Sequence, residues 1–575
     1  MGMKIGLEDA LRLAPSQLGI DFETTGVNWI SDEALVLGMH GNDFSHYIDL
    51  REYSKSQLEA FFNKFKQGRA FILHNAKFDF HFMKRWTSPY DVVFSDTMLM
   101  AQLIAEGSPA SLEDLSTLYF GPFSVKAKKV VDDWLNNHKV GRKKNYNFGE
   151  VPSELLGARA IEDSRNSFML YDIERPKIYN SDVYMLEKSL LKALLQVESN
   201  GMLVDVRYLN KLKVEYEEKI NAYIRKYDGI DLNSSIQIGE ILFDKMKITP
   251  LKFTAKSRKP SADEESLKGL AKNVPFVRDV LDYRYAAHMY SAFIIGLLDK
   301  LDSANRIHCD FRQLGARTGR LSCVNPNLQQ IPSDTGLIRI AFISPTLLWS
   351  FDYSQMEAIL YAIISRDENV LSVLRSGRDL YTNWAATLYD VPYESINKED
   401  VRRKKCKTLF LGVMYGMGKE KFEKQTEGIP MEKIDNTFRS LRKYRNDIRQ
   451  FLNANGYVET VYGRRRHLTR EENYKGVNSI IQGSAADIMK YSIVNLSDSL
   501  RDKMRLTVHD ELIFEDLNKD EVEEIKTVMT SCNPLLRVSS GKGKNWWEAS
   551  KKDDTVSVST MIMEDSEDMV EAGVS

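Results

Sequence analysis

Apolar and polar positions alternate with a different period in different parts of the chain. In residues 1–185, short apolar runs that read as buried strands, such as residues 18–20 and 70–73, alternate with helix-like segments such as residues 77–86. Strands that alternate with helices are typical of an α/β domain. The pattern then turns helical as far as about residue 301, with a polar, lysine-rich interruption at residues 254–261.

Strand patterns return in the second half of the chain. Residues 306–351 carry them, with turn residues at 325–327, and residues 370–455 are helical and charged. Residues 505–515 read as a strand, a tight turn and a second strand. The last 23 residues, 553–575, hold seven acids and no Lys or Arg, and we expect a disordered acidic tail there.

Composition indicates an ordinary globular protein. A chain of 575 residues is too long for one core and suggests roughly two to four domains. The net charge of -2 hides basic runs at 126–129, 142–144, 252–259, 402–407 and 464–466, which could bind nucleic acid or simply face solvent. No apolar run is long enough to span a membrane, and no signal peptide is recognisable, so we expect a cytoplasmic protein.

A first set of acids lies in the α/β region. Asp21 and Glu23 follow an apolar strand, and strand alternation points both side chains to one face. Two carboxylates so close repel each other unless a divalent cation such as Mg²⁺ lies between them. Asp79 opens a helix four residues after Asn75, and Asp172 lies in a later helix. A single acid-x-acid pair is weak evidence, because such pairs often arise by chance.

A second set of acids lies in the later strand regions. The apolar residues 347–351 lead into Asp352, and the hairpin at 508–512 presents Asp510 and Glu511. Acids that emerge from a core need metals or partners to offset their desolvation. Taken alone, the second hairpin could be an ordinary polar turn.

A helical stripe lies between these acids. Arg403, Lys407, Leu411 and Tyr415 recur every four residues and therefore share one helix face. Two cations and an aromatic ring on one stripe suit a triphosphate and a base. The other reading, a solvated basic face, fits less well because the opposite face is apolar enough to bury.

The first 180 or so residues resemble the proofreading 3′-5′ exonucleases, whose acidic motifs are DxE, Nx3D and Yx3D. The resemblance implies an RNase H-like fold and two-metal hydrolysis, with Asp21, Glu23, Asp79 and Asp172 as catalytic residues and metal ligands. In this register Phe168 stands where the family has a tyrosine that orients the attacking water. We therefore expect an active but weakened exonuclease.

Nearly the whole chain, residues 18–550, resembles the family A, Klenow-like DNA polymerases. Residues 352–357 match their motif A, residues 403–416 motif B and residues 508–511 motif C. Further matching segments are 198–201, 233–235, 317–322, 327–332, 456–460 and 482–483. The resemblance implies a mixed α/β and α+β multidomain protein, in which the exonuclease domain precedes a right-hand polymerase domain.

That resemblance also implies a division of the chain. The expected units are the exonuclease (1–185), the start of the palm with a helical thumb (186–305), the palm with motif A (306–370), the fingers with motif B (371–490), the palm with motif C (491–552) and the tail (553–575). No room is left before the exonuclease for a 5′ nuclease domain, and the layout looks phage-like.

The resemblance assigns roles in polymerisation. Asp352 and Asp510 would be catalytic and ligate two Mg²⁺ ions, with Mn²⁺ as an alternative, and Glu511 would support them. The expected dNTP-binding residues are Tyr353, Glu357, Arg403, Lys407, Leu411 and Tyr415. The expected DNA-binding residues are Arg320, Asn327, Gln330, Asn478, Gln482 and His509. Leu411 departs from the family, which has Phe or Tyr there, and we expect discrimination against dideoxynucleotides.

The implied activity is template-directed DNA synthesis with proofreading, and we expect it to serve phage replication. The expected partners are primer-template DNA and dNTPs, with a helicase-primase and a single-strand binding protein as candidate replisome contacts, and the chain is expected to be a monomer. The alternatives are a repair or translesion polymerase, a single-subunit RNA polymerase and an inactive replisome scaffold.

Overall fold

The structure, a computed structural model, describes residues 3–138, 148–254, 258–333, 335–426, 428–433 and 439–551. The acidic segment 553–575 and the basic run at 142–144 therefore lie outside the described residues. Within the described ranges, no helix has both the length and the apolar character needed to cross a membrane.

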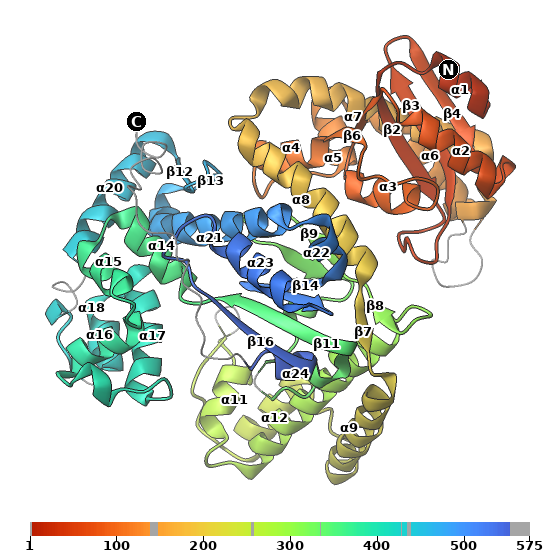
Figure 1. Ribbon diagram of the computed structural model, residues 1–575. Coiled ribbons are helices and arrows are strands. Elements are labelled where there is room, and N and C mark those ends of the chain that lie inside the picture. The colour runs from red at the N-terminus through yellow and green to blue at the C-terminus, as the bar shows by residue number, and fades with distance from the viewer. Residues whose placement is uncertain are drawn as a thin grey trace.

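The N-terminal part is a mixed sheet covered by helices, drawn in red and orange in Figure 1. Its strand order is β1-β4-β3-β2-β5-β6, with β2 antiparallel to β3 and parallel to β5. The strands are β1 (Met3–Lys4), β2 (Gln17–Thr24), β3 (Ala34–Gly41), β4 (Phe44–Asp49), β5 (Ala70–Leu73) and β6 (Val93–Asp96). The helices are α1 (Leu7–Leu13), α2 (Lys55–Phe65), α3 (Ala76–Met83), α4 (Thr97–Ile104), α5 (Leu112–Phe120), α6 (Lys126–Asn137) and α7 (Ser153–Glu174). The α/β domain predicted for this region is confirmed.

Helix α7 packs unusually close to the sheet because two strand positions are glycine. A Cβ atom on Gly19 of β2 would lie 2.1 Å from the carbonyl oxygen of Ser164, and one on Gly38 of β3 would lie 2.2 Å from the backbone of Ala160. Any larger residue would push the helix away. The two glycines therefore bring the middle of α7 against the strand that carries Asp21 and Glu23.

Helix α8 (Ser181–Asn200) joins the N-terminal part to the rest of the molecule. One of its faces enters the core of the N-terminal part through Val183, Leu191 and Leu195, and another enters the larger core of the rest of the molecule through Leu190 and Leu194. In Figure 1 this helix runs in yellow from the orange helices to the central sheet. The two parts thus share one helix, which crosses the division expected at residue 185.

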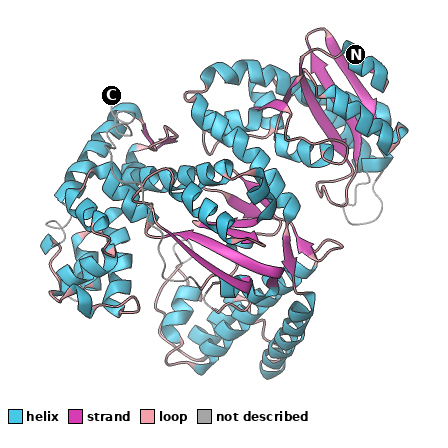
Figure 2. Ribbon diagram, viewed as in Figure 1, coloured by secondary structure: helices cyan, strands magenta, loops and turns pink. Residues whose placement is uncertain are grey.

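A second sheet forms the centre of the molecule, shown in magenta in Figure 2. Its order is β14-β15-β11-β7-β8, and β16 pairs with the other edge of β11. Its strands are β7 (Met202–Val204), β8 (Arg306–Ile307), β11 (Phe342–Tyr353), β14 (Met504–Val508), β15 (Glu511–Glu515) and β16 (Val538–Asn545). Short hairpins flank it, namely β9 (Asp310–Arg312) with β10 (Ser322–Val324), and β12 (Tyr457–Glu459) with β13 (Arg465–His467).

Helices extend from this sheet in two directions, as fingers and thumb extend from a palm (Figure 1). The lower group contains α9 (Val206–Lys226), α10 (Ser235–Gly239), α11 (Glu264–Leu270), α12 (Pro275–His288) and α13 (Gly296–Leu298). The group on the left contains α14 (Met356–Ser365), α15 (Glu368–Arg375), α16 (Leu380–Tyr389), α17 (Val401–Met414), α18 (Lys419–Gln425) and α20 (Arg439–Asn455). The remaining helices cover the sheet or lie at its end: α21 (Gly476–Asn495), α22 (Asp498–Lys503), α23 (Lys519–Thr530) and α24 (Trp546–Ala549).

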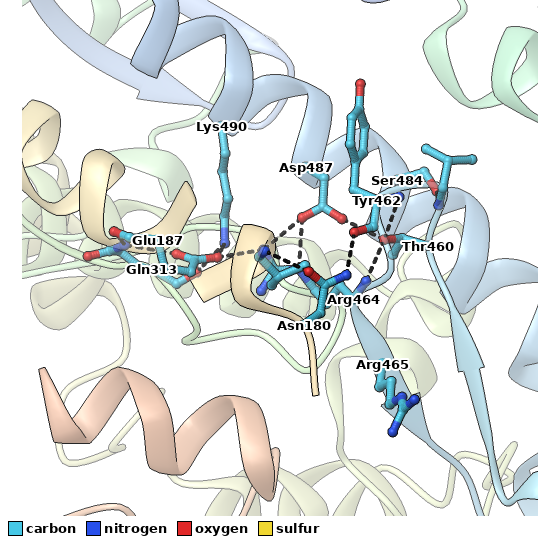
Figure 3. A network of polar contacts seen from close by, with 12 residues as sticks. Asn180, Glu187, Gln313, Thr460, Tyr462, Arg464, Arg465, Ser484, Asp487 and Lys490 are labelled. Atoms are coloured by element: carbon cyan, nitrogen blue, oxygen red, sulfur yellow. Dashed lines mark hydrogen bonds and ion pairs between the residues drawn. The ribbon is translucent and has the colours of Figure 1, made fainter. Parts of the chain in front are cut away.

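A buried ionic cluster ties three of these elements together (Figure 3). Glu187 of α8 accepts hydrogen bonds from Lys490 of α21 and from Arg464, which follows β12, at 2.5 Å each. Arg464 also donates to Asp487 of α21 at 2.8 Å. Two acids and two bases balance within this cluster, which is the condition under which buried charges are tolerated.

Candidate active sites

The first acidic set converges at the carboxyl-terminal half of β2. Asp21 and Glu23 are two residues apart on that strand, and Asp163 approaches them from α7. A carboxylate oxygen from each of the three lies within 4.8 Å of the other two. Three buried or half-buried carboxylates at this separation make a donor set suited to a hard divalent cation.

Asp79 reaches the same place from the start of α3. It is buried, and its Oδ1 accepts the backbone N–H of Phe22, the residue between Asp21 and Glu23, at 3.2 Å. Asn75 precedes α3 in the left-handed conformation, with φ +69°. The carboxylate of Asp96 at the end of β6 accepts the N–H groups of Asn75 and Ala76 at 3.2 and 2.7 Å, and so fixes where α3 begins.

The structure does not bring Asp172 to this site. Asp172 is exposed, and it follows Asp163 by nine residues on the same helix. Nine residues are about two and a half helical turns, so its side chain leaves α7 on the opposite side. The expected placement of Asp172 is therefore corrected, because the structure places Asp163 beside Asp21 and Glu23 instead.

The change of register moves the family tyrosine position from Phe168 to Arg159, four residues before Asp163. Phe168 lies against β3, with its ring edge-on to His40 at a centroid distance of 5.6 Å. Arg159 forms an ion pair with Glu23 through Nε and Oε1 at 2.8 Å and lies 3.8 Å from Asp163. The residue that departs from the family pattern is thus a cation inside the acidic set.

Burial and mutual repulsion perturb these carboxyl groups strongly. Burial, together with the neighbouring acids, raises the pKa of Asp21 and of Asp79 well above the usual range. Burial raises the pKa of Glu23 to about 8 and that of Asp163 to about 6, although Arg159 lowers both. The set carries more negative charge than one arginine can balance, which is the electrostatic setting in which a carboxylate cluster holds a metal ion.

The second acidic set forms where two strands of the central sheet meet. Asp352 lies near the end of β11, and Asp510 lies in the turn between β14 and β15. The backbone N–H of Tyr353 donates to the carbonyl oxygen of Asp510 at 3.2 Å, which holds the two segments side by side. Burial raises the pKa of Asp510, Asp352 and Glu357 raise it further, and Arg320 opposes them.

Glu511 is the cross-strand partner of Asp352 but makes its own contacts. Its carboxylate is buried and accepts hydrogen bonds from the hydroxyl groups of Ser350 and Ser550, while Arg339 lies 3.9 Å away. These contacts fix the position of the Glu511 carboxylate, and its supporting role stays a prediction.

Glu357, the first acid of α14, links two residues predicted to contact nucleotide and DNA. It accepts a hydrogen bond from Arg320 at 2.6 Å and another from the hydroxyl of Tyr415 at the end of α17. Gln482 of α21 forms a further side-chain hydrogen bond with Tyr415. The structure therefore joins four of the predicted residues in one network beside Asp510.

The stripe on α17 is formed as the spacing predicts. Lys407 is exposed, Leu411 is half-buried, and Arg403 lies one turn before Lys407. The Arg403 guanidinium makes a two-point contact with Asp379, through Nε at 3.0 Å and Nη2 at 2.8 Å. Asp379 also caps α16 and accepts a hydrogen bond from Gln355. Sequence reasoning missed Asp379, because nothing in its local pattern distinguishes it from an ordinary helix cap.

Tyr353 differs from its predicted role. Its side chain points into the core, where the hydroxyl contacts Ser492 at 2.7 Å and donates to the carbonyl oxygen of Met529 at 2.6 Å. Neighbouring residues on a strand face opposite sides, so Tyr353 must turn away from the face that Asp352 occupies. The prediction that this side chain binds dNTP is corrected.

Two of the predicted DNA contacts, Arg320 and His509, line a hollow that Asp510 also lines. Gln329 lines it too, together with apolar residues of α21. His509 and Gln330 are exposed, and Asn327 caps the short helix that carries Gln330. The remaining predicted contacts, Asn478 and Gln482, lie four residues apart on α21. The roles of these residues toward DNA stay predictions.

Comparison with known proteins agrees with this geometry. The model of the family described as "DNA polymerase family A" matches residues 206–548, and one described as "3'-5' exonuclease" matches residues 5–149. The second match ends before α7, so the place of Asp163 rests on the structure.

Individual proteins with similar sequences are DNA polymerases. The chain is 30% identical to a DNA polymerase I of Borreliella burgdorferi, over 95% of this chain and 64% of that protein. It is 35% identical to a thermostable DNA polymerase I of Thermus aquaticus, over 63% of this chain and 48% of that protein. The chain thus spans between about half and two thirds of the length of these relatives.

A solved structure supports the fold. The POL domain of Pol1 from M. smegmatis, in complex with DNA primer-template and dNTP, superposes with a TM-score of 0.81 at 26% identity, over 96% of this chain and 100% of that one. The right-hand polymerase fold expected from the sequence is confirmed. The family match, the fold and the two carboxylate sites agree, and the chain belongs to DNA polymerase family A.

Proposed function

We propose that this chain adds deoxynucleotides to the 3′ end of a primer on a DNA template and removes nucleotides from the same end. The observation that carries the proposal is the presence of two separate carboxylate sites. Asp352 and Asp510 meet at the strand ends of the palm, and Asp21, Glu23, Asp79 and Asp163 meet on β2. The solved relative that binds primer-template and dNTP supports it.

Divalent metal dependence is general among family A polymerases and their exonucleases, and the donor sets here fit such ions. We propose Mg²⁺, two ions at each site, with Mn²⁺ as a substitute. Asp352 and Asp510 would hold the ions in the palm, and the four acids around β2 would hold them in the exonuclease. The bound ions would supply an activated oxygen nucleophile and stabilise the leaving oxygen.

The chain's own residues would orient the incoming nucleotide. Arg403 and Lys407 on α17 carry positive charge toward the triphosphate, and Leu411 on the same stripe would lie against the sugar. Tyr415 would stack near the nascent base pair, and its hydroxyl would leave Glu357 when the nucleotide enters. Glu357 would then exclude a 2′-hydroxyl, which favours deoxynucleotides over ribonucleotides.

Primer-template would lie across the hollow beside Asp510. Arg320 and His509 line this hollow. Gln482, Asn327, Gln330 and Asn478 would contact the duplex beyond it. Base pairs present acceptors at common positions in the minor groove, so Arg and Gln can test pair geometry there without reading sequence.

In the exonuclease site, Arg159 would act where the family uses a tyrosine. In the structure it neutralises part of the charge on Glu23. When metal ions take over that role, the guanidinium would be free to contact the scissile phosphate. The expectation of a weakened exonuclease, which rested on Phe168, is therefore withdrawn in favour of one that uses arginine at this position.

Primer extension and primer degradation with Mg²⁺, on matched and mismatched ends, test the proposal. We expect extension of matched ends with dNTPs and faster degradation of mismatched ends. Extension with ribonucleotides at an equal rate would favour an RNA polymerase, and DNA binding without either reaction would favour a scaffold.

Finer expectations are part of the same proposal. They are a monomer that acts in the cytoplasm, replication of phage DNA, and contacts with a helicase-primase and a single-strand binding protein. The division into exonuclease (1–185), the start of the palm with a helical thumb (186–305), palm (306–370 and 491–552) and fingers (371–490) is also part of the proposal. A repair role is distinguished by low processivity on long templates.

A further inference from the structure

Helix α3 carries a candidate metal ligand on one side and a polymerase contact on the other. Asp79 faces β2, where it accepts the N–H of Phe22. Lys77 and His81 are each two residues from Asp79, or about 200° around the helix axis, and so share the opposite face. All three side chains are buried. A short helix held in this way behaves as a rigid piece, so a change on one face moves the other.

Lys77 and His81 both contact the same acid, Glu198, near the end of α8. The Lys77 ammonium donates to Oε1 of Glu198 and also to Asp310, at 2.8 Å for Asp310. The Nε2 atom of His81 lies 2.6 Å from Oε2 of Glu198. Glu198 is 2% exposed, and its Oε1 also accepts the backbone N–H of Phe311 at 2.6 Å. A single buried carboxylate therefore clamps α3 to the polymerase part.

The contacts of Lys77 extend to the β9–β10 hairpin, which leads to the polymerase site. Asp310 and Phe311 belong to β9, and Lys77 also donates to the carbonyl oxygen of Phe311. β9 pairs with β10, and the turn between them contains Arg320, which contacts Glu357. α3 is thus bound to an element of the palm rather than to its own domain alone.

The loop after β2 docks at the same place. Trp29 stacks on His81 with ring centroids 4.3 Å apart, and its ring also lies edge-on to His308 at 5.4 Å. His308 in turn contacts the carbonyl oxygen of Glu198 at 2.7 Å. Two segments therefore meet the polymerase part at the same point. One is the loop that follows β2, the strand of Asp21 and Glu23, and the other is α3, the helix of Asp79.

We propose that Lys77 and Glu198 are positioning residues of the exonuclease, through which the palm holds Asp79 in place against β2. The inference rests on the proposed function, because it takes Asp79 as a ligand of the exonuclease metal. Removing a residue that holds a metal ligand in position commonly lowers activity or metal affinity by about 10–100-fold. The exonuclease would accordingly depend on the polymerase part for its geometry.

The test uses the full chain and the variant Lys77→Met, with single-stranded DNA degradation measured against Mg²⁺ concentration. We expect kcat to fall at least about tenfold and the Mg²⁺ requirement to rise, with KM for DNA and primer extension changed less than about twofold. Lys77→Arg, which keeps the charge, should recover part of the rate.

The matched control is Lys66→Met. Lys66 is another nearly buried lysine of the exonuclease part, paired with Asp91 at 2.6 Å, and its side chain is 10% exposed against 9% for Lys77. It does not touch α3 in the interactions that the described residues make. Its loss should leave the Mg²⁺ requirement unchanged.

Two further variants separate the possible failures. If Lys77→Met proves unfolded by thermal melting, Glu198→Gln removes the negative partner of the same ion pair with little change of shape and should give the same loss. Asp79→Ala tests the proposed site itself. The inference would be overturned if Glu198→Gln degraded DNA at the wild-type rate with the wild-type Mg²⁺ dependence while Asp79→Ala was inactive. If Asp79→Ala kept its exonuclease activity, the proposed metal site itself would be overturned.

Discussion

Single residues decide which acids form a site. Asp21 and Asp352 could be predicted because each follows a short apolar run, and an acid directly after a run that predicts a buried strand is a recognisable signal. Asp163 could not be told from Asp172 by pattern alone, because both lie on one long helix and the choice depends on which face meets the sheet. That face is fixed by Gly19 and Gly38, whose importance appears only when the helix is in place.

The two acids of α7 give a direct test at the residue scale. Asp163→Asn should reduce single-stranded DNA degradation by about 10²–10³-fold, because it removes an electrostatic contact to the reacting centre. Asp172→Asn is the control on the same helix and should leave the rate unchanged, since its side chain is exposed. The degradation rate is measured from the release of nucleotide product. A lower rate in Asp172→Asn than in Asp163→Asn would instead support Asp172 as the fourth acid.

Leu411 on α17 should control selection against dideoxynucleotides. Leu411→Tyr would add a hydroxyl near the incoming sugar, and one hydrogen bond of about 1 kcal/mol corresponds to about a fivefold gain in dideoxynucleotide use. Leu411→Phe supplies the ring without the hydroxyl and should not show this gain. Competition between dideoxy- and deoxynucleotides in primer extension measures the ratio, and equal effects of Tyr and Phe would refute the hydrogen-bond explanation.

Glu174 should make stability depend on pH. Burial, with Asp96 nearby, raises its pKa from 4.5 to about 8 in the folded protein. The folded state then holds a proton that the unfolded chain releases, so this residue's contribution to stability falls as pH rises from about 4.5 to 8. Glu174→Gln has no such proton, and its gain in melting temperature over the wild type should be larger at pH 8 than at pH 5. A pH-independent difference would contradict the assignment.

At the scale of elements, α8 and the strand ends determine how the parts meet. The sequence pattern placed the strands around Asp352 and Asp510 and the helix of Arg403 correctly, because their apolar periods are strong. It did not indicate that α8 enters both cores, nor that Glu187, Arg464, Asp487 and Lys490 form one cluster. Those charges are up to 303 residues apart in the chain, and local periodicity carries no information on such contacts.

The cluster in Figure 3 predicts coupled effects on stability. Glu187→Gln alone leaves Lys490 and Arg464 facing one acid, and breaking a buried pair in this way typically costs about 3–5 kcal/mol. Adding Lys490→Met restores the charge balance, so the double variant should be more stable than Glu187→Gln alone. Thermal unfolding midpoints of the two single variants and the double variant measure this coupling. Additive losses would show that the charges act independently.

At the scale of the whole molecule, two separate carboxylate sites share one scaffold. Family resemblance predicted the polymerase fold and the exonuclease fold, and the comparisons confirmed both. What resemblance could not supply is the connection between them. That connection lies in α8, in the ionic cluster and in the contact of α3 with Glu198, all of which depend on tertiary packing.

The most direct test of the two-site account is a pair of inactivating variants assayed on one mismatched primer-template with Mg²⁺. Asp510→Ala should lose primer extension and retain degradation, and Asp21→Ala should lose degradation and retain extension. Loss of both reactions in either variant, or loss of neither, would contradict the assignment of two independent carboxylate sites.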